Sequence, residues 1–95
     1  MRHTVVFKLK FPKDSSKEKE FFKAVNTLSF IPGVCNFEIL HETSKKNDFE
    51  YCLSMEFATY EIYDAYNKHS DHISFVDTYW VNYVEKFLEL DYEVF

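Results

Sequence analysis

Polar and apolar side chains alternate strictly along residues 2–11. One side carries His3, Val5, Phe7, Leu9 and Phe11, and the other carries Arg2, Thr4, Val6, Lys8 and Lys10. A period of two is typical of a β-strand with one face against a core. The alternation therefore predicts a strand that places His3 on its apolar face.

A period of three to four replaces this alternation in residues 14–30. The apolar stripe consists of Phe21, Phe22, Val25 and Leu28, with Lys17, Glu18, Lys23 and Asn26 outside it. Ser15 or Ser16 can serve as the N-cap, and Pro32 with Gly33 ends the pattern. These features predict an amphipathic helix of about four turns.

Two further alternating segments, residues 34–41 and 48–57, flank the polar turn 42–47 and predict a β-hairpin. Thr59 can then cap a helix that runs through Tyr66 and Lys68. Ser70 or Asp71 can cap another helix, which carries Val76, Tyr79, Trp80, Tyr83, Val84 and Phe87. Residues 87–95 alternate again, with Leu88, Leu90, Tyr92 and Val94 on one side.

The predicted order is strand, helix, strand, strand, broken helix, strand, the split βαβ pattern of an α+β, ferredoxin-like antiparallel sheet. Its helices cover one face only. The other face is expected to carry Val6, Phe37, Ile39 and Cys52, and half-apolar faces of this kind are covered by a second subunit. We therefore expect residues 1–95 to form a single domain that pairs as a homodimer.

Composition narrows the classes of function. Aromatic residues make up 20% of the chain, more ring surface than a small core normally holds, so some rings should line a pocket or an interface. The net charge of −5 is carried by interspersed acids and bases, which argues against nucleic-acid binding. The sequence lacks a long apolar run and a leader-like start, and Cys35 and Cys52 have no disulfide or zinc spacing. We expect a cytoplasmic protein that does not enter membranes.

The stretch AYNKHSDH, residues 65–72, repeats a titratable side chain at every third position: Tyr66, His69 and His72. If one helix ends near Lys68 and another begins after Ser70 or Asp71, His69 lies at a negative helix end and His72 at a positive one. The first imidazole should then favour the cation and the second the neutral form, which can accept a proton.

His3 is expected to point toward the same gap between sheet and helices as Tyr66 and His72. In that arrangement His72 removes a proton next to a carbonyl, Tyr66 stabilises the enolate oxygen, and His3 orients the substrate or shares the proton. The structural alternative is that the histidines cap carbonyls and the tyrosine ring is simply buried.

A metal site would need His69 and His72 with Asp71 and Asp77, but the break between the helices disrupts that spacing. The lone glycine, Gly33, is too little for a phosphate-binding loop. We expect no metal and no cofactor.

Five segments together resemble the stress-responsive dimeric α/β-barrel (Dabb) family: RHTVVFKLK, SFIPGVCNFEI, KNDFEYCLSMEF, AYNKHSDHISFV and FLELDYE. The resemblance implies a ferredoxin-like subunit whose sheet faces that of a partner, so that a homodimer closes a barrel. The family includes a plant polyketide cyclase that closes a ring by aldol condensation without metal or cofactor. Its catalytic histidine, its partner tyrosine and two further histidines match His72, Tyr66, His3 and His69.

Differences from that cyclase concern the pocket. Val76 stands where the cyclase has a small glycine, Val25 where it has a tyrosine, and Ser70 where the family often has proline. The resemblance therefore implies a reshaped pocket, and the plant substrate does not carry over.

Our first hypothesis is a protein that binds a small apolar carbonyl or aromatic compound and acts as a cofactor-independent cyclase or isomerase. Substrate contacts are expected from Val5, Phe7, Phe22, Val25, His69, Phe75 and Val76. One alternative is a non-catalytic stress-response or interaction module whose vestigial pocket is plugged by Phe7, Phe22, Val76 and Trp80. Another is a cofactor-free oxygenase, because related barrels oxidise electron-rich aromatics.

Overall fold

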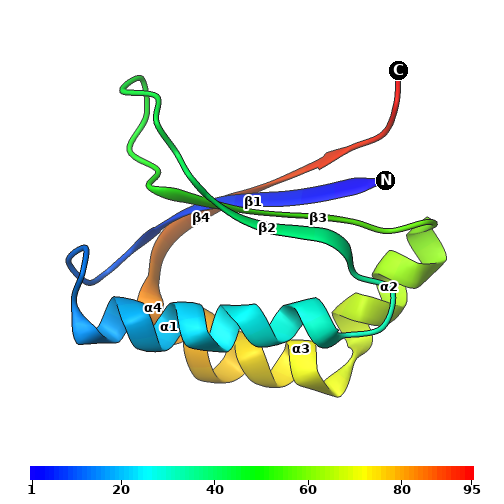
Figure 1. The fold of residues 1–95 in the computed structure, drawn as a ribbon, viewed down its shortest axis with the longest axis horizontal. Helices are drawn as coiled ribbons and strands as arrows, with labels where there is room; N and C mark the ends of the chain where they lie inside the picture. The colour runs from blue at the N-terminus through cyan, green and yellow to red at the C-terminus, as the bar shows by residue number, and fades with distance from the viewer.

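The computed structural model describes residues 1–95 and contains one antiparallel sheet with helices on one face (Figure 1). The strands are β1 (Arg2–Leu9), β2 (Cys35–His41), β3 (Tyr51–Glu56) and β4 (Val84–Tyr92), in the order β2-β3-β1-β4. This strand order confirms the predicted ferredoxin-like fold and makes β4 an edge strand. None of the helices has the length and apolar character needed to span a bilayer.

The first helix, α1 (Ser16–Asn26), follows the sequence pattern closely. The Ser15 hydroxyl accepts a hydrogen bond from the Glu18 N–H at 3.2 Å, which confirms the predicted N-cap. A 3₁₀ turn, η1 (Thr27–Phe30), continues the helix. Gly33 then turns the chain with φ of +92°, and a Cβ at this position would collide with Ile62. Glycine is therefore required there for both its dihedral and its size.

The second helix, α2 (Tyr60–Lys68), begins at the predicted cap, where Thr59 accepts the Ile62 N–H. The next cap prediction is wrong. His69, and not Ser70 or Asp71, caps α3 (Ser70–Phe75), with its Nδ1 accepting the Asp71 N–H at 3.1 Å. The reason is that His69 has the extended backbone a cap requires, whereas Ser70 is already helical.

A π-helix, η2 (Val76–Trp80), and one short turn, α4 (Val81–Tyr83), follow α3 without a break. The strand β4 begins at Val84, so the prediction of Val84 and Phe87 as helical is wrong. Their spacing fits a helix, but Val84 pairs with Leu9 of β1 instead. Sheet pairing thus outweighs the local helical periodicity here.

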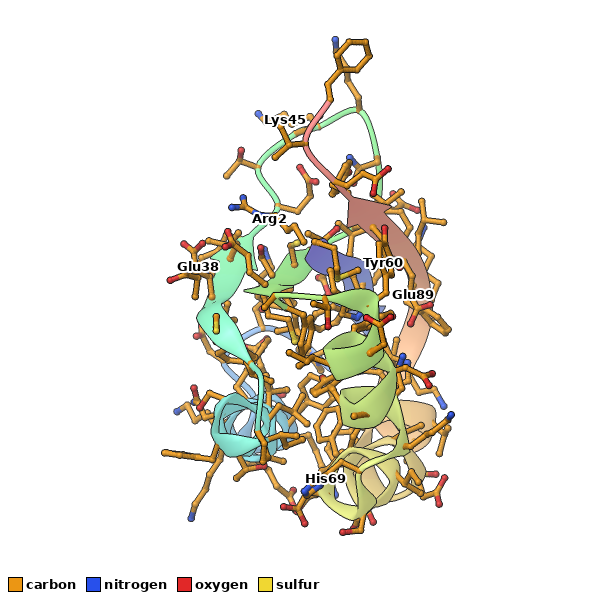
Figure 2. The ribbon with its side chains drawn as sticks, turned by 90° about the vertical axis from the view of Figure 1, so that its right-hand side faces the viewer. Arg2, Glu38, Lys45, Tyr60, His69 and Glu89 are labelled. Carbon is orange, nitrogen blue, oxygen red and sulfur yellow. The ribbon has the colours of Figure 1, made fainter.

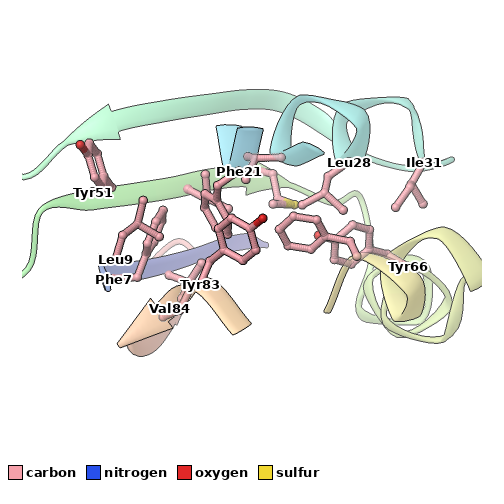
Figure 3. Packing of buried hydrophobic residues seen from close by; sticks show 14 of the residues in the cluster. Phe7, Leu9, Phe21, Leu28, Ile31, Tyr51, Tyr66, Tyr83 and Val84 are labelled. Carbon is pink, nitrogen blue, oxygen red and sulfur yellow. The ribbon is translucent and has the colours of Figure 1, made fainter. Parts of the chain in front are cut away.

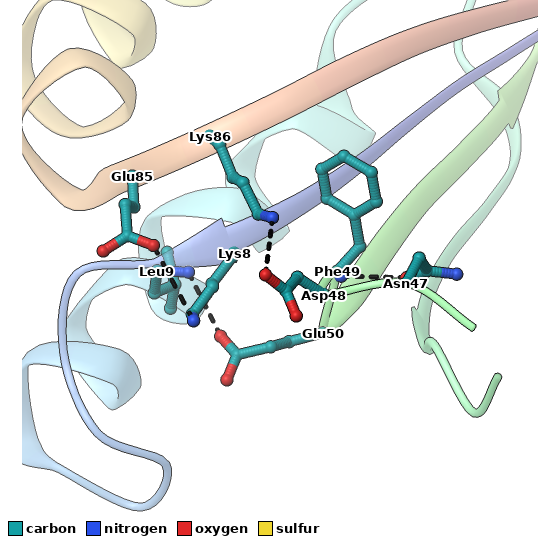
Figure 4. A network of polar contacts seen from close by, with 8 residues as sticks. All are labelled: Lys8, Leu9, Asn47, Asp48, Phe49, Glu50, Glu85 and Lys86. Carbon is teal, nitrogen blue, oxygen red and sulfur yellow. Dashed lines mark hydrogen bonds and ion pairs between the residues drawn. The ribbon is translucent and has the colours of Figure 1, made fainter. Parts of the chain in front are cut away.

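The hairpin also differs in its bounds, because β3 begins at Tyr51 and residues 48–50 belong to the loop. Side chains hold this loop against the sheet (Figure 4). Lys86 Nζ lies 3.1 Å from an Asp48 carboxylate oxygen, and Leu9 N donates to Glu50 Oε1 at 3.2 Å. These contacts add to the backbone bonds of Glu50, which donates to the Phe7 carbonyl at 3.0 Å and accepts from the Glu42 N–H at 2.9 Å.

A bulge near the start of β2, where Asn36 has φ of 50°, shifts the alternation of that strand. Ile39 therefore lies opposite the core residue Leu53, and Phe37 packs against the core. The prediction that Phe37 and Ile39 lie on the uncovered face is wrong. Leu40 lies on that face instead.

The core fills the space between sheet and helices (Figure 3). Phe7 of β1 and Phe21 and Val25 of α1 have no exposed surface. Burying a side chain of this size contributes about 1.5–3 kcal/mol. The opposite side of the sheet, which we term the outer face, presents Val6 next to Leu88, and no helix covers it (Figure 1).

Candidate functional site

A cavity of about 270 Å³, which we term the inner cavity, lies between the sheet and the helices. Nine of its twelve lining residues are hydrophobic if the ring of Tyr66 is counted with them. Its apolar walls come from the sheet (Val5, Leu53, Met55, Phe87) and from the helical layer (Leu28, Phe75, Val76, Trp80). The polar lining groups are His3, Tyr66, His72 and Glu89. An apolar cavity with a few convergent polar groups is the usual form of a small-molecule site.

The structure brings together the three residues that the sequence analysis proposed as a group. His3 reaches the inner cavity from β1, Tyr66 from α2 and His72 from α3. His3 is 5% exposed and Tyr66 only 2%. A larger hollow of about 610 Å³ lies on the outer face, but it contains no histidine and its only tyrosine, Tyr92, is exposed. Because the acid–base groups line the inner cavity, this cavity is the candidate site and the outer hollow is not.

His72 is held in one tautomer. Its Nδ1 lies 3.2 Å from the carbonyl oxygen of Asn67, and because a carbonyl can only accept, Nδ1 carries the proton. The Nε2 lone pair is then available, and no group of the chain donates to it. A histidine in this state can act as a base.

Burial lowers the pKa of His72 below its ordinary value of 6.5. The nearby His3 lowers it further, while the Asn67 carbonyl and Glu89 oppose these effects. The imidazole is thus neutral at pH 7, in the direction expected from the sequence. The main cause is desolvation by the surrounding protein and not the helix end that we had invoked.

Burial also raises the pKa of Tyr66 above its ordinary value, and the neighbouring Tyr63 and Glu89 add to this effect. The phenol therefore stays protonated across the physiological range. Its hydroxyl forms no hydrogen bond within the chain, so it is free to donate one to a molecule in the cavity.

His3 forms a close pair with Asp91, which the sequence analysis missed. His3 Nδ1 lies 2.6 Å from Asp91 Oδ1, and the two residues are direct neighbours in strands β1 and β4. The His3 ring also contacts the ring of Tyr63, with centroids 4.9 Å apart. The carboxylate and the aromatic ring together fix the orientation of this imidazole.

Glu89 is the second acidic residue that the sequence analysis missed, and it lies opposite Val5 in the same pairing. The sequence did contain a signal for both acids. Alternation places Glu89 and Asp91 together on the side opposite Leu88 and Leu90, and the pairing with β1 makes this the side of His3.

Only some of the predicted substrate-contact residues line the inner cavity. Val5, Phe75 and Val76 line it. Phe7 and Val25 lie within the solid core instead, because rings and helix side chains surround them completely. The predicted contacts Phe22 and His69 also lie outside the cavity.

Phe22 packs edge-on against Tyr51 at 4.8 Å and so lies at the far side of the core from the cavity. The four-residue plug that would fill the pocket is not formed. Trp80 and Val76 act as walls, while Phe7 and Phe22 lie elsewhere. The inner cavity therefore remains open.

His69 serves the helix junction and does not line the cavity. Its Nδ1 accepts the backbone N–H that begins α3, and a nitrogen that accepts a hydrogen bond carries no proton. His69 is thus a capping residue.

Metal-ligating groups are scattered in this fold. No set of three or more His, Cys, Asp or Glu side chains is placed to hold a metal ion. Cys35 is exposed and Cys52 half-buried, and both are free thiols.

Solved structures with the same fold cover almost the whole chain. A Dabb family protein with a ferredoxin-like fold from Mesorhizobium loti is 49% identical, with a TM-score of 0.96 over 99% of this chain and 95% of that one. Hydroxynitrile lyase from Passiflora edulis is 14% identical, with a TM-score of 0.82 over 96% and 89% of the two chains. A dimeric ferredoxin-like protein of unknown function from Thermobifida fusca is 14% identical, with a TM-score of 0.80 over 98% and 89%.

No curated protein matches the sequence. The family described as the stress responsive A/B barrel domain, Dabb, matches residues 1–94. This match covers nearly the full length of the chain. The solved Dabb protein, at 49% identity, also covers nearly the full length. The chain therefore belongs to the stress-responsive A/B barrel domain family.

Proposed function

We propose that this protein binds a small apolar carbonyl or aromatic compound in the inner cavity and moves a proton on it without a metal or cofactor. The reaction class is that of a cyclase or isomerase. The observation that carries the proposal is that one apolar cavity contains both a neutral histidine, His72, with an unoccupied Nε2, and a protonated tyrosine, Tyr66, with a free hydroxyl.

The proposed step begins with Nε2 of His72 taking a proton from the carbon next to the ligand carbonyl. The C–H bond breaks, and its electron pair passes to the carbonyl oxygen to give an enolate. Tyr66 donates a hydrogen bond to that oxygen, and the imidazolium then returns its proton to the product. A positioned base contributes about 10²–10⁴-fold and a hydrogen-bond donor about 10²–10³-fold in rate.

The proposed role of His3 is to position the ligand. The Asp91 carboxylate holds the proton on Nδ1 of His3, which leaves Nε2 as an acceptor for a hydroxyl group of the ligand. Asp91 itself does not line the inner cavity. It is therefore a positioning residue in this scheme.

We also propose that residues 1–95 act as one domain that pairs through the outer face to form a homodimer. Leu88 is 49% exposed there, beside Val6 and the larger hollow. Exposed apolar area of this kind is stabilised by contact with a second copy. The Thermobifida fusca neighbour with this fold is described as dimeric, which supports the proposal.

The proton-transfer proposal is tested by incubating the protein with simple ketones and β-keto esters in D₂O. Deuterium uptake at the carbon next to the carbonyl is followed by NMR. We expect faster exchange than in buffer, reduced at least tenfold in His72→Gln and in Tyr66→Phe. His41→Gln is the matched control, because His41 is an exposed imidazole outside the inner cavity.

Three other outcomes favour different functions. Binding without exchange supports the non-catalytic module. Oxygen-dependent turnover of electron-rich aromatics, lost under nitrogen, supports the oxygenase. Release of an aldehyde and cyanide from an aromatic cyanohydrin would support lyase chemistry, which we include because the Passiflora edulis neighbour is a hydroxynitrile lyase.

A further inference from the structure

The inner cavity has one acidic lining residue. Glu89 is its only carboxylate, and no lysine or arginine lines it. Glu89 also takes part in no ion pair. The lysines nearest to it along β1 and β4 are committed elsewhere, Lys8 to Glu85 at 3.7 Å and Lys86 to Asp48 at 3.1 Å. The negative charge at the cavity is therefore not compensated by a neighbouring side chain.

Glu89 lies where the cavity meets solvent. It belongs to the edge strand β4, and Figure 2 shows it at the margin of the molecule. Phe87, two residues earlier on the same side, is 52% exposed and packs edge-on against Trp80 at 5.4 Å. A ligand that enters along this edge passes the Phe87 ring and the Glu89 carboxylate before it reaches His72.

We propose that Glu89 sets the charge selectivity of the inner cavity, so that its ligands carry a protonated amine on an apolar ring or chain and carboxylates are excluded. This inference rests on the proposed function, since it assumes that the cavity binds a small apolar compound. The Coulomb energy between unit charges several ångströms apart near a protein surface corresponds to about a tenfold change in affinity. The affinities of an amine and a carboxylate ligand of the same shape therefore differ by at least this factor.

The test uses three compounds of similar size and shape: 3-phenylpropylamine, 4-phenyl-2-butanone and 3-phenylpropanoate. At pH 7 they are a cation, a neutral ketone and an anion. Dissociation constants are measured by NMR titration at low salt. We expect the amine to bind most tightly and the carboxylate most weakly, about tenfold or more apart. In Glu89→Gln the dissociation constants of the three compounds should differ by less than about twofold, because the carboxylate that distinguishes their charges is gone. We call this difference the spread.

Glu61→Gln is the matched control. It changes the net charge of the protein equally, but Glu61 is an exposed α2 residue outside the inner cavity and free of ion pairs. We expect this variant to keep the wild-type spread. A second readout uses the unmodified protein, in which raising the salt concentration narrows the spread through screening.

The outcomes separate this inference from the proposed function. Equal affinity for all three compounds overturns the charge selectivity and leaves ligand binding intact. A spread that persists in Glu89→Gln also overturns it, since the selectivity would then come from the overall charge of −5. Failure of all three compounds to bind overturns the proposed function together with the inference that rests on it.

Discussion

The rings of Tyr66 and His72 lie 4.5 Å apart between centroids and are tilted by 50°. The junction between α2 and α3 produces this contact, because the capped turn at His69 redirects the chain and brings His72 back over the preceding helix. An acid and a base are thus placed side by side within the seven residues 66–72. The pair can therefore contribute both to chemistry and to packing, and substitutions can separate the two contributions.

Tyr66→Phe removes the hydroxyl and keeps the ring. We expect it to reduce deuterium exchange at least tenfold while the melting temperature changes by only a few degrees, since the hydroxyl has no partner in the chain. Tyr66→Ala also removes a buried ring and should destabilise the fold by about 3 kcal/mol or more. Equal activity of Tyr66→Phe and wild type would exclude the hydroxyl from the proposed step.

Protonation of His72 should weaken the fold at low pH. The folded state holds its pKa below 6.5, so the unfolded chain takes up the proton first as the pH falls. The free energy of unfolding therefore drops as the pH falls through 6.5 and levels off below the folded pKa. Urea denaturation at pH 7.5 and 5 measures this drop in the free energy of unfolding. The drop should be smaller for His72→Gln than for the wild type, and a larger drop would contradict the lowered pKa of His72.

Asp91→Asn tests the positioning of His3. The amide cannot hold the Nδ1 proton as the carboxylate does, so the ¹⁵N chemical shifts of the His3 ring should change. Because His3 positions the ligand in this scheme, we expect KM to rise, with a smaller change in kcat. Asp77→Asn, in η2 and outside the cavity, is the control. An unchanged His3 spectrum would show that Tyr63 alone orients the ring.

Leu88→Glu tests the proposed dimer. A carboxylate on the outer face should raise the dimer dissociation constant at least tenfold in analytical ultracentrifugation. Ile73→Glu offers a matched control, because Ile73 lies on α3 and is 48% exposed, against 49% for Leu88. Loss of the dimer in both variants would place the interface elsewhere.

Gly33→Ala should destabilise the fold by about 1–2 kcal/mol from the positive φ alone, and further through the contact with Ile62. The double variant with Ile62→Ala removes the contact and leaves the dihedral cost. Chemical denaturation of the four proteins in this cycle measures the coupling. Strict additivity would show that Ile62 moves aside freely.

Much of the fold could be predicted from local patterns. The caps at Ser15 and Thr59 and the buried side of β1 depend on residues close together in the chain. Local patterns in the sequence are therefore enough to predict them. The bulge at Asn36 and the early start of β4 at Val84 depend on partners far along the chain, which periodicity does not reveal.

The candidate site shows the same division. His3, Tyr66 and His72 were predicted to converge because strand and helix patterns fix the sides on which they lie. Asp91 and Glu89 were missed because they join the site through pairing of β1 with β4. Once that register is known, the alternation of the closing strand places both acids beside His3.

The π-helix Val76–Trp80 has a consequence for how such a cavity can change through evolution. A π-turn is a one-residue insertion accommodated within a helix, and deleting one residue there would restore α-helical spacing and change which side chains of this segment face the cavity. Trp80, which packs on Phe7 at 5.1 Å, would then leave the wall that it now forms. A single codon gained or lost in this segment could therefore resize the cavity while the sheet and both histidines stay in place.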